Sequence, residues 1–207
     1  DVQKENIDLL SMTAHKLLGP KDCGLLYIRK GVRIENLICG GAQERNKRAG
    51  TENVAGIVGL DAALQLAVDG MDERNAKLEK MRDRLIDGLL KIERSRINGD
   101  RVHRLPGNVN MCFEGIEGES LLLRLDLKGV SASSGSACTS GSLDPSHVLL
   151  AIGLPHEIAH GSMRLSFSDD NTEEDIDYIL EIVPEIVSYL RSMSPLWEKI
   201  KKQEAQG

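Results

Sequence analysis

The fold of this chain is constrained most by a lysine in a short polar turn between two apolar strand patterns. Residues 7–12 are apolar enough for a buried strand, and residues 23–29 are typical of a second one. Between them, Gly19 and Pro20 force the backbone to bend. The pattern therefore predicts that the end of a strand presents Lys16 at a fixed point.

Thr13 and His15 stand beside Lys16 in this turn. A single lysine is by default a surface ammonium. A hydroxyl, an imidazole and an amine close together, however, suit an anionic cofactor that carries a carbonyl group. The hydroxyl and imidazole can bind a phosphate, and the amine can form a Schiff base. The turn therefore indicates a cofactor site.

A change in helix pattern divides the chain. Residues 52–68 are small or apolar nearly all round, which predicts a buried helix with Thr51 as its N-cap. Asp69 and Gly70 interrupt this pattern, and a charged amphipathic helix follows. The apolar positions of that second helix are Leu78, Met81, Leu85, Leu89 and Ile92. We place the domain boundary here, giving domains over residues 1–70 and 71–207.

The second domain mixes strand and helix patterns. Strands or strand edges are predicted over residues 107–113, 130–132 and 162–167. Helices are predicted over residues 119–127 and 144–151, and after a capping box at residues 171–174. Pro184 lies inside this last helix and predicts a kink. The chain is therefore expected to be α/β or α+β.

Composition excludes several classes of partner. The net charge of −6 and the pI near 5.4 argue against nucleic acid. Only 3% of the residues are aromatic, which disfavours stacking on unpaired bases. No apolar run is long enough to span a bilayer, so no membrane partner is expected. The chain begins with Asp1 directly before a strand pattern, so we expect the later part of a longer protein.

The four cysteines form no C-x-x-C pair, which indicates a reducing compartment, and we expect a cytoplasmic protein. Cys138 stands in a small, polar stretch over residues 133–142, without apolar neighbours to bury it. A thiol in a flexible loop can serve catalysis or be incidental, and both interpretations stay open. Cys23 and Cys112 lie on strand patterns and are predicted to be structural. Cys39 is left unassigned.

Two other patterns have a functional and an ordinary interpretation. His156 to His160 matches H-E-x-x-H, a zinc motif that needs a sustained helix and a third ligand. The glycines and proline around it allow barely one turn, so local packing is the better interpretation and no metal is expected. Pairing Cys138 with a histidine, as in thiol proteases, is a weaker alternative. Arg164 lies in an alternating strand, where its guanidinium is either a surface group or a fork for a carboxylate.

Taken together, these stretches resemble the cysteine desulfurases, which are pyridoxal phosphate enzymes of the class V aminotransferase group with the fold-type I architecture. The matching segments follow in order along almost the whole chain: residues 13–21, 48–54, 133–142, 144–149, 159–164 and 194–197. The long Ser/Gly loop around Cys138 resembles the subgroup that feeds iron–sulfur cluster assembly.

The resemblance implies a cofactor site for pyridoxal 5'-phosphate. Lys16 would hold the cofactor as a Schiff base and would move the proton of the substrate α-carbon. Thr13 and His15 would bind the cofactor phosphate. Thr51 would reach the phosphate of the other subunit's cofactor, which implies a homodimer.

It also implies the substrate and the second catalytic residue. Arg164 would hold the carboxylate of L-cysteine. Cys138 would take the sulfur as a persulfide, leaving L-alanine, and would pass it to a sulfur-acceptor or scaffold protein. The intact protein would thus be a cysteine desulfurase, a sulfur transferase.

The resemblance further implies that this chain is a C-terminal half. Residues 1–70 would end the large cofactor domain, and residues 71–207 would form the small α+β domain with the cysteine loop. The family's first half carries the residues that stack on the cofactor ring and pair with its nitrogen, so we expect this fragment alone to be inactive. A selenocysteine lyase-like enzyme and a non-enzymatic dimerisation or docking module remain alternatives.

Overall fold

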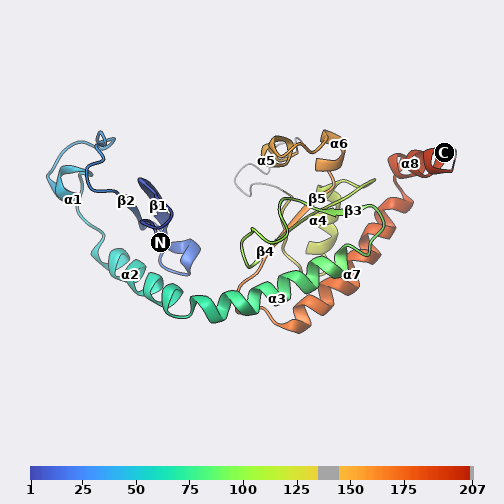
Figure 1. The fold of residues 1–207 in the computed structure, drawn as a ribbon, viewed down its shortest axis with the longest axis horizontal. Coiled ribbons are helices and arrows are strands. Elements are labelled where there is room, and N and C mark those ends of the chain that lie inside the picture. Colours follow the sequence, from blue (N-terminus) through green and yellow to red (C-terminus); the bar gives the residue numbers. More distant parts are fainter. Residues whose placement is uncertain (135–144, 206–207) are drawn as a thin grey trace. The chain divides into compact units, whose positions relative to one another are not determined.

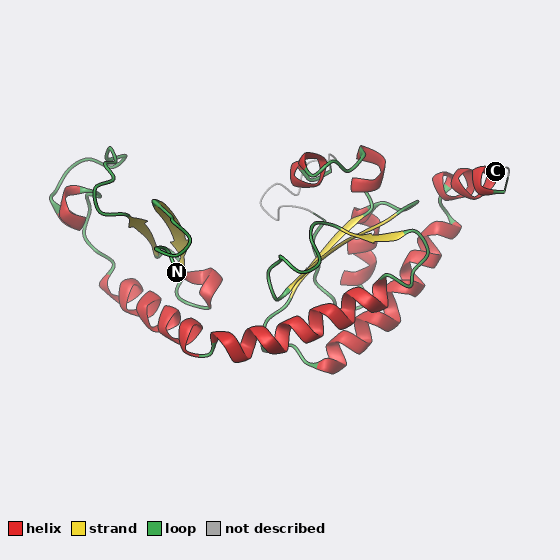
Figure 2. Cartoon of the chain, in the orientation of Figure 1, coloured by secondary structure: helices red, strands yellow, loops and turns green. Residues whose placement is uncertain are grey.

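The computed structural model describes residues 1–134 and 145–205. The chain forms two compact units, Asp1–Met71 and Asp72–Gly207. Figure 1 follows the chain from the N-terminus, and Figure 2 separates helices from strands. Helices and strands mix in both units, so the expected α/β class is confirmed. The roles assigned to the two domains stay predictions.

The first unit is built on a two-stranded antiparallel sheet. Strand β1 (Leu9–Thr13) pairs with β2 (Gly24–Ile28) along their whole lengths. A 3-10 helix, η1 (Ala14–Leu17), follows β1 directly. The short helix α1 (Gln43–Asn46) and the long helix α2 (Val54–Asp69) complete the unit. Both predicted strands are present, with slightly different ends, but the burial predicted for the first is wrong, because no residue of β1 is buried within this small unit.

Two predictions about α2 are wrong. The N-cap is Asn53 and not Thr51, because the Asn53 side-chain oxygen accepts the Gly56 N–H at 3.1 Å. The helix is also not buried all round. Its buried residues are Gly56, Leu60 and Ala63, which lie on one side of the helix.

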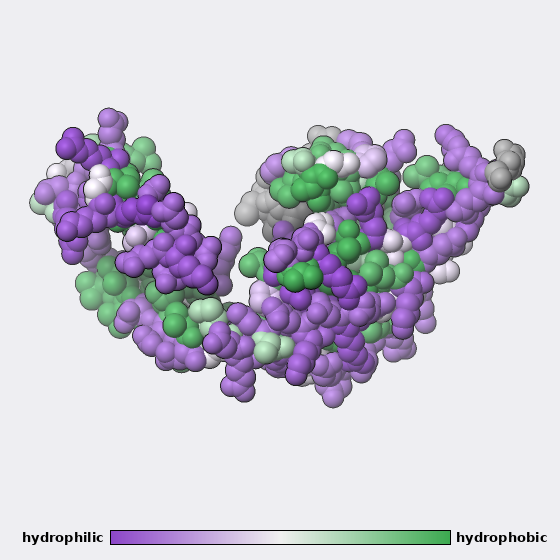
Figure 3. Space-filling view, viewed as in Figure 1, coloured by the Kyte–Doolittle hydropathy of each residue, from purple (hydrophilic) through white to green (hydrophobic). Residues whose placement is uncertain are grey.

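The other sides of α2 are apolar and exposed. Val54, Val58, Leu66 and Val68 are each more than half exposed, and Figure 3 shows apolar residues gathered over this helix. Within the first unit, only the two-stranded sheet and the turn after β1 are available to cover this helix of 16 residues. No single helix within residues 1–134 and 145–205 is both long and apolar enough to cross a membrane.

The second unit contains a three-stranded antiparallel sheet in the order β3-β4-β5. Its strands are β3 (Ser95–Ile97), β4 (Asn108–Phe113) and β5 (Ser162–Ser166). Helices α3 (Met71–Leu89), α4 (Gly118–Asp126) and α7 (Glu173–Ser192) supply most of the remaining core. The residues of this core include Met81, Leu85, Leu89, Val109, Met111, Phe113, Leu121, Val183 and Val187.

The short helices α5 (His147–Ala151) and α6 (His156–Ala159) belong to a second apolar cluster. It joins Cys112 of β4 to Leu149, Leu154 and Ala159. Alternation along β4 correctly predicted that Val109, Met111 and Phe113 point into the main core. Cys112, on the other side of β4, is also fully buried, because the second cluster covers it.

Several details differ from the expected pattern. The capping box of α7 joins Thr172 to Asp175, one residue later than predicted. Helix α7 continues past Pro184 to Ser192, as expected, and the kink at Pro184 stays a prediction. Residues 130–132 form no strand, although the next residue, Ser133, makes an isolated bridge. The sequence analysis missed α1 and β3, which are too short to show a periodic pattern, and also α8 (Pro195–Glu204).

Helix α8 packs without burying any residue completely. The Arg191 guanidinium lies 3.9 Å from the centre of the Trp197 ring, which is a cation–π contact. Arg94 forms ion pairs with Glu114 at 2.5 Å and with Glu204 of α8 at 2.7 Å. Trp197 also lies against Gly115, which has φ +83°. The tryptophan and these charges thus hold α8 on the unit.

The Gly115 contact can be tested by substitution. We expect Gly115→Ala to lower the free energy of unfolding by at least about 2 kcal/mol, because positive φ is unfavourable for alanine and its Cβ meets the indole. Gly129→Ala is the matched control, since Gly129 has φ +78° with open space around it. It should cost only about 1 kcal/mol. Urea unfolding followed by the fluorescence of Trp197, the single tryptophan, measures both. Equal losses of unfolding free energy in the two variants would contradict the contact between Gly115 and Trp197.

The corrected N-cap gives a second test. Asn53→Ala should destabilise the first turn of α2 by about 1 kcal/mol and speed amide exchange at Gly56 about fivefold. Thr51→Ala should leave that exchange unchanged, because Thr51 makes no cap. Hydrogen exchange of the Gly56 amide distinguishes the two residues. A larger effect from Thr51→Ala would restore the original N-cap prediction.

Candidate active site

The turn that carries Lys16 is closed at its base by the hairpin. The Ala14 N–H donates to the Cys23 carbonyl at 2.9 Å, and the Gly19 N–H donates back to the Ala14 carbonyl at 2.9 Å. Ala14 is fully buried, whereas Lys16 is exposed. The Lys16 ammonium has no hydrogen-bond or ion-pair partner in the described part of the chain. The backbone that carries Lys16 is therefore held in place, and its amine is accessible for chemistry.

Small residues of α2 bring this helix against the turn. An added Cβ at Gly59 would lie 2.4 Å from Pro20, and one at Gly19 would lie 3.1 Å from the Ala63 side chain. Larger residues at these points would push the turn away from the helix. The small residues of α2 therefore fix the turn on which Lys16 stands.

Thr13 and His15 lie together at the end of β1. The Thr13 hydroxyl is 2.9 Å from Nδ1 of His15, and it donates to the Cys23 carbonyl at 3.5 Å. Both residues line a cavity of about 430 Å³, along with Lys21, Asp22, Cys23 and Gly24. The structure thus groups two of the predicted phosphate-binding residues around one space, with Lys16 in the same turn.

The donors around this cavity fit the phosphate of the expected cofactor. A hydroxyl, an imidazole and the Lys21 ammonium face the space, against the single carboxylate of Asp22. Such donors form charge-assisted hydrogen bonds to phosphate oxygens. Sequence analysis did not assign Lys21 a role, although it lies in the same matching segment. Its place at the cavity follows from the pairing of β1 with β2.

Thr51 lies in the first unit but outside this cavity. It is exposed and precedes the start of α2 at Val54. Near it, the Gly50 N–H donates to the side-chain oxygen of Gln43 at 3.2 Å, which ties the loop to α1. Its predicted contact with a partner subunit's cofactor stays a prediction.

Arg164 lies in the middle of β5, opposite Asn110 of β4. At the other edge of β5, the main chain of Arg164 forms an isolated bridge with Ser133. The side chain is half-buried, and its guanidinium has no hydrogen-bond or ion-pair partner among residues 1–134 and 145–205. An arginine whose guanidinium has no carboxylate partner among these residues can bind one from a ligand. The predicted carboxylate role therefore fits its surroundings.

Cys138, the predicted sulfur acceptor, lies outside the described residues. Cys23, Cys39 and Cys112 are all free thiols. Burial raises the pKa of the Cys112 thiol, to which the Asn98 side chain donates at 3.1 Å. This position agrees with the structural role predicted for Cys112. Cys39 is exposed and Cys23 lies beside Thr13 at the cavity.

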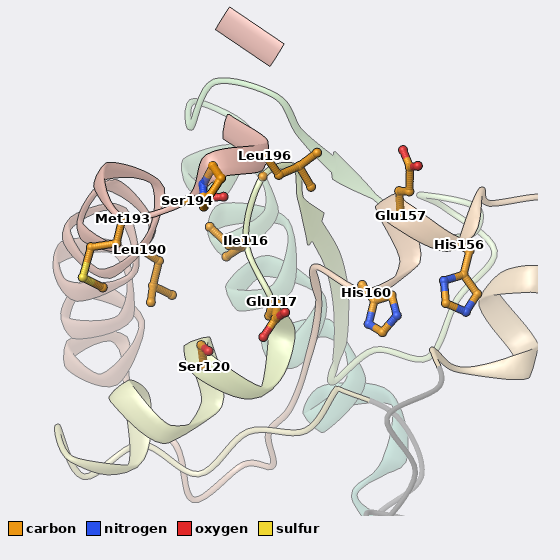
Figure 4. A pocket seen from close by; sticks show the side chains of 12 residues that line it. Ile116, Glu117, Ser120, His156, Glu157, His160, Leu190, Met193, Ser194 and Leu196 are labelled. Carbon is orange, nitrogen blue, oxygen red and sulfur yellow. The ribbon is translucent and has the colours of Figure 1, made fainter. Parts of the chain in front are cut away.

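The H-E-x-x-H stretch lies at α6, a helix of only four residues. The rings of His156 and His160 meet edge to face with centroids 4.6 Å apart. In the described part of the chain, no group of three or more His, Cys, Asp or Glu side chains could hold a metal ion. Both histidines line a cavity of about 450 Å³, with Leu190 and Met193 on the opposite side (Figure 4).

Comparison with known proteins places these observations in a family. Residues 1–179 match the family described as aminotransferase class-V. The cysteine desulfurase IscS of Clostridium botulinum is 60% identical over 209 residues, which cover 100% of this chain and 53% of that protein. The IscS of Methanosarcina thermophila is 62% identical over 199 residues, covering 96% of this chain and 49% of that protein.

A solved structure agrees with these sequence matches. A NifS-like protein is 39% identical, with a TM-score of 0.81, and the match covers 92% of this chain and 49% of that one. The likeness confirms the expected fold-type I architecture. The chain spans about half the length of the curated relatives it matches. A family match over residues 1–179 and this structural likeness lead to one conclusion: the chain belongs to the class-V aminotransferase family.

Proposed function

We propose that this chain is the C-terminal half of a cysteine desulfurase, which converts L-cysteine to L-alanine and transfers the sulfur to Cys138 as a persulfide. One observation carries the proposal. Lys16 stands on a fixed turn beside a cavity that Thr13 and His15 line with phosphate-binding groups. The curated relatives named cysteine desulfurase IscS support the same reaction.

Pyridoxal 5'-phosphate is the cofactor of this family. When bound, it withdraws electrons from the attached substrate and so makes the bond between carbon and sulfur breakable. Thr13, His15 and Lys21 would hold its phosphate in the cavity. Thr51 would serve the partner subunit's cofactor in a homodimer. The amine of Lys16 would take the proton from the substrate α-carbon.

Arg164 and Cys138 complete the proposed reaction. The Arg164 guanidinium would pair with the substrate carboxylate and orient L-cysteine. The Cys138 thiolate would attack the substrate sulfur, so that an S–S bond forms while the C–S bond breaks. The electron pair of the broken bond stays with the substrate carbon, which becomes the methyl group of alanine after protonation.

The persulfide would then pass to an acceptor. The IscS name of the relatives supports a sulfur-acceptor or scaffold protein in iron–sulfur cluster assembly as the partner. We also propose a cytoplasmic location. The free thiols of Cys23, Cys39 and Cys112 support it, because thiols stay reduced there.

The proposed role of Lys16 can be tested in the full-length protein loaded with pyridoxal phosphate. Lys16→Ala should remove the visible absorbance of the bound cofactor and lower alanine formation from L-cysteine by at least about 10³-fold. Lys30→Ala is the control, since Lys30 is another exposed lysine of the same unit. Unchanged alanine formation by Lys16→Ala would refute the proposal. Faster release of selenide than sulfide would instead favour the selenocysteine lyase alternative.

The role of Cys138 needs a separate measurement. Cys138→Ser should keep the cofactor absorbance but lose sulfur transfer by at least about 10³-fold, because a hydroxyl cannot carry the persulfide. Cys39→Ser, at an exposed thiol, should transfer sulfur normally. Mass spectrometry after incubation with L-cysteine reports the added sulfur atom. A Cys138→Ser variant that keeps its biological role would favour the docking-module alternative.

A further inference from the structure

We propose that Ser162 is a positioning residue for Arg164. Its buried hydroxyl fixes the carbonyl of Ser134 and so secures the bridge between Ser133 and the main chain of Arg164. This inference rests on the proposed function, in which Arg164 binds the substrate carboxylate. It adds a residue whose effect on the substrate passes through the backbone of β5.

Arg164 is held along both edges of its strand. On one side Asn110 of β4 lies opposite it. On the other side the Arg164 N–H donates to the Ser133 carbonyl at 2.5 Å, and the Ser133 N–H donates to the Arg164 carbonyl at 3.0 Å. Ser133 belongs to no strand, so this outer pairing is a single bridge. A hydrogen bond beside such a bridge strengthens it.

Ser162 supplies that support from two positions earlier on β5. Its hydroxyl donates to the Ser134 carbonyl at 2.9 Å. Ser162 is only 2% exposed, so water cannot readily replace this bond. Residues 162 and 164 lie on the same face of the strand, because side chains alternate. Two successive residues of the outer segment, Ser133 and Ser134, are thus bound to β5.

The start of α4 closes around the same contact. The Gly118 N–H donates to the His160 carbonyl at 2.8 Å. A Cβ at Gly118 would lie 2.6 Å from the Ser162 carbonyl oxygen and 3.3 Å from the Ser134 side chain. Glycine therefore allows α4 to approach both residues closely. The packing leaves Ser134 little freedom to move away when its hydrogen bond is present.

The Arg164 side chain depends on this backbone. Its guanidinium has no ion-pair or hydrogen-bond partner in the parts of the chain that are described, so no carboxylate of those parts sets its direction. The position of the strand decides where the guanidinium can reach. If the Ser133 bridge loosens, the backbone of Arg164 becomes more mobile, and its guanidinium no longer lies at one position for the substrate carboxylate.

This role predicts a specific kinetic signature. A carboxylate bound equally in the ground state and the transition state affects KM and leaves kcat unchanged. Ser162→Ala in the full-length holoenzyme should raise KM for L-cysteine about tenfold and change kcat less than about twofold. A merely structural role would lower the active fraction, reducing kcat at constant KM. That outcome would overturn the inference.

Matched inhibitors sharpen the test. L-Alanine and ethylamine differ by the carboxylate, so Ser162→Ala should weaken inhibition by L-alanine about tenfold and leave ethylamine within about twofold. Ser166→Ala is the control variant, since Ser166 lies exposed on the same strand. Ser162→Cys keeps a side chain of similar size but donates weakly, so it should behave like Ser162→Ala. It also serves if the alanine variant fails to fold. Wild-type behaviour of Ser162→Cys would overturn the inference.

Hydrogen exchange separates this inference from the proposed function. Ser162→Ala should speed exchange of the Ser133 and Arg164 amides at least about fivefold, and Ser166→Ala should not. Faster exchange in Ser162→Ala, together with no alanine formation by the wild-type protein, would refute the function and leave the anchor. Unchanged exchange and KM in Ser162→Ala, together with a raised KM in Arg164→Lys, would refute the anchor alone.

Discussion

The contact between α2 and the turn of Lys16 is the constraint on which the candidate site depends. The backbone of the turn must be fixed although the Lys16 side chain is exposed, and the two-stranded hairpin contacts only one end of that turn. Gly59 and Ala63 let the helix approach Pro20 and Gly19 closely enough to fix the turn. Each close contact contributes little, but together they exclude other positions of the turn. Thr13 and His15 then share one cavity because the turn is fixed.

The second unit uses the same principle with a sheet. Apolar residues of β4 pack into the main core, and Cys112 packs into a second cluster beside α5 and α6. The end of β4 is thereby buried on both faces, at Met111, Cys112 and Phe113. Strand β5 is positioned by its regular antiparallel pairing with β4. Arg164 thus stands on a paired strand, and its guanidinium has no ion-pair or hydrogen-bond partner among the residues that the structure describes. Such a placement on a scaffold is what an oriented carboxylate site requires.

The errors of the sequence analysis have a common physical cause. Strands β1, β2, β4 and β5 and helices α3, α4 and α7 were predicted because a repeating apolar pattern is local information. Burial of α2 was misjudged, because burial depends on elements far along the chain. The N-cap was assigned to Thr51 on residue type, whereas the cap is decided by which side chain reaches the Gly56 N–H. Lys21 was missed for a similar reason, since its place in the cavity arises only from the closed hairpin.

The sequence by itself determined the family resemblance, the α/β class and the residue types at Thr13, His15, Lys16 and Arg164. These follow from the order of residues along the chain, which can be read without a tertiary structure. Tertiary structure alone decided that Lys21 joins Thr13 and His15 at one cavity, that most of α2 is exposed, and that Ser162 holds Ser134 beside Arg164. The physical reason is that such contacts join residues distant in sequence. Their distances follow from packing, which no single stretch of the chain encodes.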